Sequence, residues 1–335
     1  MKQKIRGVNL GGWLVLEKWI TPSLFEGTTA QDELNLHKVQ FKDKIINHYQ
    51  SFITEDDFRF LSENSINTLR IPVGYWLFGD YPPFIENINY LDFAFKYANK
   101  YNLNILIDLH AAPGSQNGYD HSGVVGNVNW DKDAKYIYQT LNILDRISKR
   151  YCKNKSLFGI SLLNEPHKNI PIKLLENFYI QGYKTVRNHC NESVAVIISD
   201  SFRPIKFSKL LQDSVFKNVI LDSHFYQCFY EGNKRLNMNQ IIKNTKSEWK
   251  KIIDDVQKYK PLLCGEWSLG IDPMSLSKLS PENKISAIKE FGRTQMDIFE
   301  NSIGWFFWTY KTESDDGWNF KKRLEDKTII INVDK

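Results

Sequence analysis

Short apolar runs alternate along the chain with longer segments of helical periodicity. Each run is rich in β-branched and aliphatic residues and ends in a polar residue or cluster, a pattern that predicts buried strands. Eight strands are predicted, at 7–12, 67–73, 104–110, 158–165, 194–200, 218–226, 261–267 and 303–309. Helices are predicted around them at 34–50, 91–101, 134–151, 172–190, 238–259 and 284–300.

Continuous apolar strands that alternate with amphipathic helices indicate a parallel sheet covered by helices. Eight such units in 335 residues favour a closed α/β barrel, the (β/α)8 or TIM barrel, as a single domain over residues 1–335. An open nucleotide-binding sheet would carry a Gly-x-Gly-x-x-Gly turn after its first strand, and the sequence has no such turn. We therefore expect one barrel.

Polar and aromatic side chains stand at the ends of most of the predicted strands. They are Arg70, His110, Asn164, Glu165, His224, Tyr226, Glu266 and Trp308. In barrels of this kind the carboxyl ends of the strands form a single mouth, where active sites lie. These residues are therefore expected to converge on one pocket.

Glu165 and Glu266 each follow an apolar strand, three strand units apart. Two carboxyl groups in different environments can share the cleavage of a glycosidic bond. One is protonated and serves the leaving oxygen, and the other is ionised and faces the positive charge that develops on the sugar. Alone, Asn164-Glu165-Pro166 is read equally well as a turn that starts a helix. The second glutamate favours the catalytic interpretation.

Six segments together resemble the exo-β-1,3-glucanase subfamily of glycoside hydrolase family five. They are GVNLGGWLVLE at 7–17, LRIPVGYW at 69–76, DLHAAPGSQNG at 108–118, LNEP at 163–166, GEWS at 265–268 and GWFFWT at 304–309. They occur in the family's order and cover the chain from about residue 6 to residue 320. The resemblance implies a TIM barrel that hydrolyses β-glucosidic bonds with retention of configuration, without a metal ion or other cofactor.

The resemblance also implies a role for each catalytic carboxyl group. Glu165 would be the general acid/base, with a pKa raised by enclosure and by the neighbouring anion. Glu266 would be the nucleophile, kept ionised by Arg70 and by the Tyr226 hydroxyl. Asn164 would donate a hydrogen bond to the sugar 2-hydroxyl.

His110 and His224 would be neutral residues that orient the sugar and the acid, and Trp308 would form the floor beneath the cleaved sugar. Without the resemblance, the favoured interpretation is a hydrogen-bonded core residue for either histidine and a structural ion pair for Arg70. For Trp308, core packing is as good an interpretation as the floor. The resemblance therefore decides these assignments.

Four further residues are matched to the ends of the family's pocket. Glu17 and Asp120 would bind hydroxyl groups at its closed end, whereas Tyr119 and Phe229 would clamp the next sugar at its entrance. Without the resemblance, Glu17 is an ordinary loop charge and Asp120 an ordinary turn residue. Tyr119 stands where the family usually has Phe, which keeps the ring face and adds a hydroxyl.

The expected activity is exo-hydrolysis of β-1,3-glucan, one glucose at a time from the non-reducing end. Two alternatives stay open: the same machinery acting on a glycolipid or an aryl glucoside, and a non-catalytic glycan-binding barrel. Ala111 stands where the family commonly has Gly, and the loop at 269–283 is shorter and poorer in Gly than in secreted fungal members. The linkage preference is therefore not fixed by the resemblance.

The charge and aromatic composition agree with a carbohydrate substrate. Lys and Arg total 44 against 39 Asp and Glu, and this small excess of +5 is scattered, so no nucleic-acid partner is expected. The chain has 9 Trp, 16 Tyr and 21 Phe, whose rings provide flat binding surfaces. The oligomeric state stays open.

The cysteines are too sparse for a disulfide scaffold and lack the spacing of a zinc site. Cys152, Cys190, Cys228 and Cys264 are therefore expected to be reduced thiols.

No apolar run reaches the ~18 residues that a membrane-spanning helix needs. The basic and then apolar N-terminus resembles a signal peptide, but Asn9 and the missing cleavage site favour a first core strand. The expected location is the cytoplasm, or outside the cell if a leader has been removed.

Overall fold

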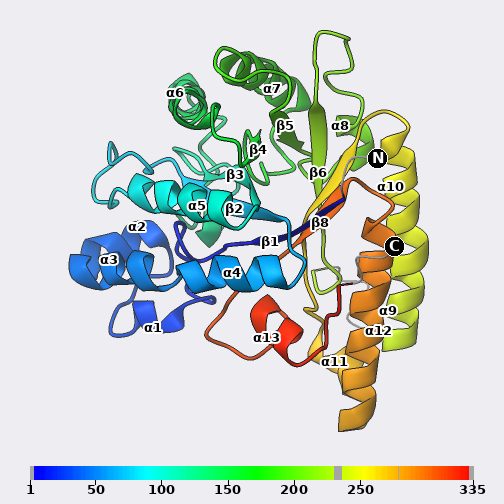
Figure 1. Ribbon diagram of the computed structural model, residues 1–335. Helices are drawn as coiled ribbons and strands as arrows, with labels where there is room; N and C mark the ends of the chain where they lie inside the picture. The colour runs from blue at the N-terminus through cyan, green and yellow to red at the C-terminus, as the bar shows by residue number, and fades with distance from the viewer. Residues whose placement is uncertain (1–3, 230–235, 278, 332–335) are drawn as a thin grey trace.

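The computed structural model describes residues 4–229, 236–277 and 279–331. Its eight strands are parallel and pair in sequence order, and β1 pairs with β8 to close the barrel (Figure 1). They are β1 (Ile5–Asn9), β2 (Thr68–Gly74), β3 (Asn104–Ala111), β4 (Leu157–Ser161), β5 (Ala195–Ser199), β6 (Val219–Phe225), β7 (Leu262–Trp267) and β8 (Gly304–Phe307). The predicted TIM barrel is confirmed.

Helices surround the barrel, with α2, α3 and α4 on one side in Figure 1 and α9, α10 and α12 on the other. The longer helices are α2 (Glu33–Val39), α3 (Lys42–Ser51), α4 (Glu55–Glu63), α5 (Ile88–Lys100), α6 (Ala134–Tyr151), α7 (Ile172–Arg187), α9 (Met238–Asn244), α10 (Lys250–Gln257) and α12 (Pro281–Phe299). Short helical segments are α1 (Pro22–Phe25), η1 (Asp120–Ser122), α8 (Pro204–Phe207), η3 (Thr245–Trp249), α11 (Pro273–Leu276) and α13 (Phe320–Glu325).

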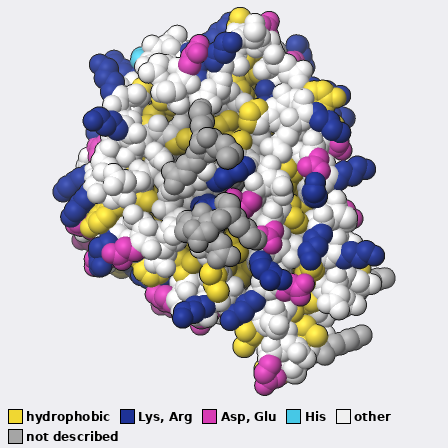
Figure 2. Space-filling view, turned by 45° about the vertical axis from the view of Figure 1, so that its right-hand side comes forward, with side chains coloured by type: hydrophobic (Ala, Val, Ile, Leu, Met, Phe, Trp, Pro, Cys, Tyr) yellow, Lys and Arg dark blue, Asp and Glu magenta, His cyan; other side chains and the backbone are white. Residues whose placement is uncertain are grey.

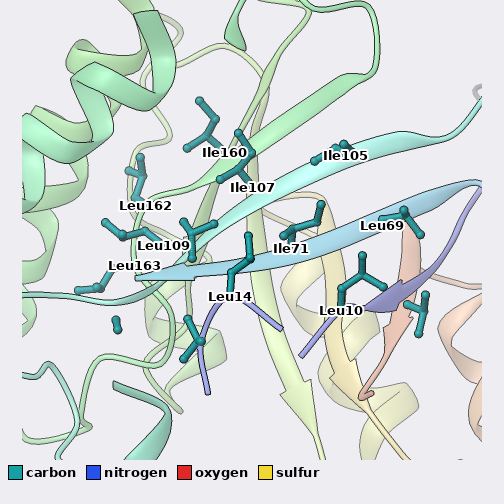
Figure 3. Close-up of a cluster of buried hydrophobic side chains, with 14 of the residues drawn as sticks. Leu10, Leu14, Leu69, Ile71, Ile105, Ile107, Leu109, Ile160, Leu162 and Leu163 are labelled. Carbon is teal, nitrogen blue, oxygen red and sulfur yellow. The ribbon is translucent and has the colours of Figure 1, made fainter. Parts of the chain in front are cut away.

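The main hydrophobic core lies between the strands and these helices, because alternate residues of a strand face opposite sides. In β3, Ile105, Ile107 and Leu109 belong to this core. Figure 3 shows part of it, where leucine and isoleucine side chains of β2, β3 and β4 lie together with Leu10 and Leu14, which follow β1.

The residues between them face the barrel interior and form a second, smaller cluster. Its buried members are Ile5, Leu106, Ala195, Ile197, Ile220, Leu263 and Phe306. Two positions after Leu106 and Ile220, on the same sides of β3 and β6, the chain has Asp108 and Asp222, both fully or almost fully buried. The interior is therefore apolar toward the amino ends of the strands and charged toward their carboxyl ends.

Two predicted helices differ from the expectation. The segment expected as one helix at 34–50 is interrupted, because Gln40 is extended and its side-chain amide donates to the Leu24 carbonyl. The segment expected at 238–259 is continuous but contains the π-helical η3 between α9 and α10. α4 was not predicted, although its capping box, in which Thr54 and Asp57 bond reciprocally, is visible in the sequence.

The expectation of four reduced thiols is wrong for one pair. Cys152 and Cys190 form a disulfide with their Cα atoms 5.0 Å apart, and it links the end of α6 to the segment that follows α7. Cys228 and Cys264 are free. The two bonded cysteines are 38 residues apart, and only the packing of α6 beside α7 brings them together.

Basic side chains are spread among acidic ones over the face in Figure 2. Within the described residues, no helix combines the length and the apolar character that crossing a membrane requires.

Candidate active site

Arg70 is the centre of a buried network at the carboxyl end of the barrel. Its side chain is fully buried, and Nη1 donates to Asn9 Oδ1 at 2.8 Å and to Glu266 Oε1 at 2.9 Å. Nη2 donates to Asn164 Oδ1 at 2.8 Å and lies 3.1 Å from Asp108 Oδ2. Burial would lower the pKa of Arg70, but the surrounding carboxylates raise it above its usual value, so the guanidinium is a permanent cation.

Glu266 is held at both carboxylate oxygens. It lies near the end of β7, where the pairing with β8 is irregular between Cys264 and Trp267, and only 5% of it is exposed. Arg70 binds Oε1, and the Tyr226 hydroxyl donates to Oε2 at 2.7 Å. These two donors fix the direction in which the carboxylate points.

Glu165 faces the same space from the loop after β4. Its backbone is in the left-handed region with φ 41°, an unusual conformation for a residue with a side chain. Oε1 lies 2.6 Å from His224 Nδ1, and Oε2 lies 3.5 Å from His121 Nε2. The side-chain amide of Asn117 donates to the Glu165 carbonyl at 3.2 Å and helps to hold this conformation.

The two glutamates are close enough to act on one sugar. One oxygen of each carboxylate lies within 4.8 Å of the other. Retaining glycosidases place these groups about 5–5.5 Å apart, whereas inverting enzymes leave roughly 6.5–9.5 Å for a water molecule. The oxygen separation of at most 4.8 Å lies nearer to the retaining range than to the inverting range.

The charges of Glu165, Glu266 and His224 influence one another. Burial would lower the pKa of His224, but three carboxylates raise it well above its usual value. Burial would raise the pKa of Glu165, but the charge and hydrogen bond of His224 lower it to about 2. Burial raises the pKa of Glu266 despite the opposing charges of His224 and Arg70.

These directions differ from the sequence-based expectation of a neutral His224 and a raised pKa at Glu165. The physical reason is the position of His224, whose Nδ1 lies against both glutamates and attracts a proton. At Glu266, Arg70 and Tyr226 lower the pKa as expected, although burial acts against them.

His110 is placed as expected. Its Nδ1 is bonded to Asp108 Oδ2 at 2.6 Å, and its Nε2 lies 3.4 Å from the side-chain nitrogen of Asn164. Burial lowers the pKa of His110, which favours the neutral ring. The Trp308 ring is stacked on His110 with a centroid distance of 5.3 Å, so this tryptophan forms one wall of the site.

Glu17 lies on the loop after β1 and is 3% exposed. Oε2 accepts a 2.8 Å hydrogen bond from the Trp19 indole, whereas Oε1 has no hydrogen-bond partner among the described residues. Burial raises the pKa of Glu17 well above its usual value, and the negative charges of Asp120, Glu266 and Glu165 raise it further. Asp120, Glu266 and Glu165 are therefore near enough for their charges to act on Glu17.

Tyr119 and Phe229 are both exposed, at 50% and 70%, as expected for an entrance. They have different ring partners: Tyr119 packs on His121, and Phe229 packs on Tyr226 and Trp318. Tyr119 and Phe229 therefore belong to different groups of packed rings.

Several site residues were not identified from the sequence. They are Asn9, Trp19, Asp108, His121, Asp222 and Trp318. A signal existed for the two aspartates, because Asp-x-His occurs at the ends of both β3 and β6 and puts each aspartate on the same side as the following histidine. His121 lies in the short η1 and Trp318 on the loop after β8, where the sequence does not show what a side chain contacts.

By geometry, Glu165, His224 and Glu266 form the one group of acidic and histidine side chains in the described part of the chain that could hold a metal ion. Hydrogen bonds account for this cluster, since His224 Nδ1 already faces both glutamates.

Two facing glutamates at the mouth of a (β/α)8 barrel are the arrangement of carboxyl groups that glycoside hydrolases use. The chain matches the cellulase family (glycosyl hydrolase family 5) over residues 28–314, and it belongs to this family. It is 33% identical to a probable glucan 1,3-beta-glucosidase A of Aspergillus niger, over 97% of this chain and 87% of that protein. It is 34% identical to a glucan 1,3-beta-glucosidase of Pichia angusta, over 96% and 84%.

Solved structures share the fold at lower sequence identity. A rutinosidase from Aspergillus niger superposes with a TM-score of 0.80 and 19% identity, over 98% of both chains. Thermotoga maritima Cel5A in complex with cellobiose gives a TM-score of 0.64 and 17% identity, also over 98% of both chains. These structures support the barrel assignment alone.

Proposed function

We propose that this chain is a retaining exo-β-1,3-glucanase that releases glucose from the non-reducing end of β-1,3-glucan. Glu266 attacks the anomeric carbon and forms a glycosyl-enzyme, while Glu165 delivers a proton to the leaving oxygen. Glu165 then removes a proton from the water that releases the sugar. The separation of at most 4.8 Å between carboxylate oxygens supports the retaining pathway.

The surrounding residues serve this reaction by orientation. Arg70 and Tyr226 orient the Glu266 carboxylate by hydrogen bonds, and Arg70 also donates to the Asn164 side-chain oxygen. The Asn164 amide nitrogen is thereby turned away from Arg70 and is available to the sugar 2-hydroxyl. Trp308, stacked on His110, offers its ring to the apolar face of the sugar.

The single observation that supports exo action is the environment of the Glu17 carboxylate. It is buried, Trp19 holds one of its oxygens, and the other has no partner among the described residues. A buried unpaired acceptor is costly unless a ligand donates to it, and sugar hydroxyls are suitable donors. Glu17 and Asp120 would thus cap the sugar at the non-reducing end. The names of the relatives support β-1,3-glucan as the polymer.

A time course on laminaripentaose tests this proposal. Glucose should be the first product, together with laminaritetraose, and it should appear initially as the β-anomer in NMR spectra. Early laminaribiose and laminaritriose would indicate an open cleft instead, and an initial α-anomer would contradict retention.

A matched pair of variants tests the cap. Glu17→Gln removes the buried acceptor charge and should lower kcat/KM on laminaribiose by about 10–100-fold, as expected for a hydrogen bond to a charged group. Glu26→Gln makes the same change at an exposed site after α1 and should leave kcat/KM unchanged. Equal kcat/KM values for the two variants would rule out the cap.

The exposed rings of Tyr119 and Phe229 favour one alternative, because they offer apolar surface to an aryl or lipid aglycone as readily as to a sugar. The same assay with an aryl glucoside and a glucosylated lipid decides between them by kcat/KM. No turnover of any substrate would favour a non-catalytic glycan-binding barrel.

A further inference from the structure

Asp222 lies on β6, two residues before His224 and on the same interior side of the strand. Its Oδ2 is 3.4 Å from His224 Nε2 and 3.7 Å from Arg70 Nη2, and the residue is 2% exposed. A Cβ atom at Gly265 on the neighbouring β7 would overlap the Asp222 carboxylate. The glycine thus leaves the space that Asp222 fills, directly below the two glutamates.

His224 has carboxylates on both sides of its ring. Nδ1 lies 2.6 Å from Glu165 Oε1 and 3.3 Å from Glu266 Oε2, and Nε2 faces Asp222. When Glu165, Glu266 and Asp222 are ionised, their oxygens only accept hydrogen bonds, so both ring nitrogens of His224 then carry a hydrogen. The ring that meets this requirement is the imidazolium.

We propose that Asp222 is a positioning residue that holds His224 as an imidazolium, and that this imidazolium stores the proton that Glu165 passes to the leaving oxygen. The inference rests on the roles proposed above for Glu165 and Glu266. It adds a source for the proton and a residue that keeps it there.

The proposed steps balance in atoms and charge. Before reaction, His224 carries one positive charge, and Glu165 and Glu266 each carry one negative charge. When Glu266 bonds to the anomeric carbon, the bond to the leaving oxygen breaks, His224 Nδ1 passes its proton to Glu165, and Glu165 passes a proton to the leaving oxygen. The products are neutral His224, ionised Glu165 and esterified Glu266, so the net charge of the three groups stays at minus one.

The second step reverses this transfer. Water bonds to the anomeric carbon, and the ester bond to Glu266 breaks to regenerate its carboxylate. The proton from water passes through Glu165 to His224, which restores the starting state.

The position of His224 couples the two events. Its Nδ1 faces the nucleophile as well as the acid, so forming the ester removes one of the anions that attract the proton. The pKa of His224 therefore falls when the leaving oxygen needs the proton. The other charged groups around the ring are Asp222, Asp200 at the end of β5, and Arg70, which shares the Asp222 carboxylate; none of them changes charge in the reaction.

The Asp222→Asn variant tests the positioning role. Asp222 raises the pKa of His224, so its loss should move the basic limb of the kcat/KM profile on laminaribiose about one unit to lower pH. The variant should lose about tenfold in kcat/KM on this substrate at pH 7. On dinitrophenyl β-glucoside, whose leaving group needs no proton, kcat/KM should stay near the wild-type value.

Asp200→Asn is the matched control, because Asp200 is buried nearby and shares no hydrogen bond with the imidazole among the described residues. It should leave the basic limb close to that of the wild type. A merely structural role of Asp222 would lower kcat/KM equally on both substrates without moving the limb, and that result would overturn the proposal.

The proton store itself is tested by ¹⁵N NMR of the histidine rings, with the His224 signals assigned by their loss in His224→Gln. His224 should be an imidazolium at pH 6.5 in the free enzyme and neutral after Glu266 is esterified with a 2-deoxy-2-fluoroglucosyl group. An adduct on Glu266 with an unchanged His224 ring would overturn the proposal and leave the retaining function intact. If no adduct formed on Glu266, both the proton store and the retaining function would be overturned.

Discussion

The Arg70 guanidinium and the Glu266 carboxylate meet at 2.9 Å, where Arg70 is fully buried and the Glu266 side chain is only 6% exposed. Nη1 makes this contact, and Nη2 of the same group holds Asn164, which precedes Glu165 in the chain. One side chain thus ties the loop that carries the proposed acid to the strand that carries the proposed nucleophile. Their relative position depends on it.

Replacing Arg70 by Met should therefore affect both stability and activity. Removing one partner of a buried ion pair leaves uncompensated charge, and we expect the free energy of unfolding to fall by about 3–5 kcal/mol. The Arg70 charge lowers the pKa of Glu266, so its loss should raise that pKa and move the acidic limb of the kcat/KM profile to higher pH. Urea denaturation and a pH profile measure the two effects.

Arg59→Met is the control, because Arg59 forms an exposed ion pair with Asp56 on α4. It should change the free energy of unfolding by about 0–1 kcal/mol. An Arg70→Met protein as stable as this control would show that the buried network is not important for stability.

The two glutamates should differ in their response to an added anion. Glu266→Gln should lose turnover on every substrate, because no glycosyl-enzyme can form. Glu165→Gln should retain activity on dinitrophenyl β-glucoside, and azide should increase it, because an anionic nucleophile needs no general base. Measuring kcat with and without azide separates the nucleophile from the acid/base. If both variants lost activity and azide restored neither, these two roles would be refuted.

Asp57 connects α4 to the segment after β8 and should make stability depend on pH. Burial would raise the pKa of Asp57, but Lys311 and further hydrogen-bond donors lower it. A lowered folded-state pKa contributes stability above the unfolded value of about 3.9, and this contribution disappears as pH falls through the folded-state pKa. Asp57→Asn should thus be less stable than the wild type at pH 7, with the difference shrinking below about pH 4.

Urea denaturation at pH 7, 5, 3.5 and 2.5 follows this difference. Asp56→Asn changes the neighbouring exposed carboxylate and should show only a small difference throughout. If the Asp57→Asn difference were the same at pH 2.5 as at pH 7, its ion pairs could not be the cause.

The disulfide should stabilise the fold without influencing catalysis. Cys152 and Cys190 lie just before β4 and β5 begin, at the end of the barrel opposite the glutamates. Replacing both by Ala should lower the free energy of unfolding by about 2–4 kcal/mol and leave kcat/KM unchanged. Dithiothreitol should lower the Tm of the wild type but not that of the variant; equal sensitivity would mean that the bond does not form.

The strands and the principal glutamates could be predicted because each depends on local sequence. An apolar run that ends in a polar residue marks both a strand and its position at the barrel mouth, as at Phe158–Glu165 and Pro261–Trp267. The break between α2 and α3 could not be predicted, since Gln40 ends the first helix by bonding to Leu24, sixteen residues away.

The protonation pattern of the site also depends on three-dimensional contacts. Enclosure alone predicts a raised pKa for Glu165, and that expectation fails because His224 on β6 approaches it to 2.6 Å. The disulfide has the same origin, because its two cysteines meet only through the packing of α6 beside α7. Sequence spacing therefore identifies which residues carry chemistry, and tertiary contacts decide their charge and partners.

The buried carboxylate of Glu17 determines how the proposed enzyme would degrade a polymer. A pocket capped there has one opening, so the freed glucose lies behind the remaining chain and can leave only after that chain has withdrawn. The enzyme then releases the glucan chain after every cut, and the next cut is made in whichever chain end binds next. A population of glucan chains would consequently shorten evenly, with no chain digested to completion while its neighbours stay intact.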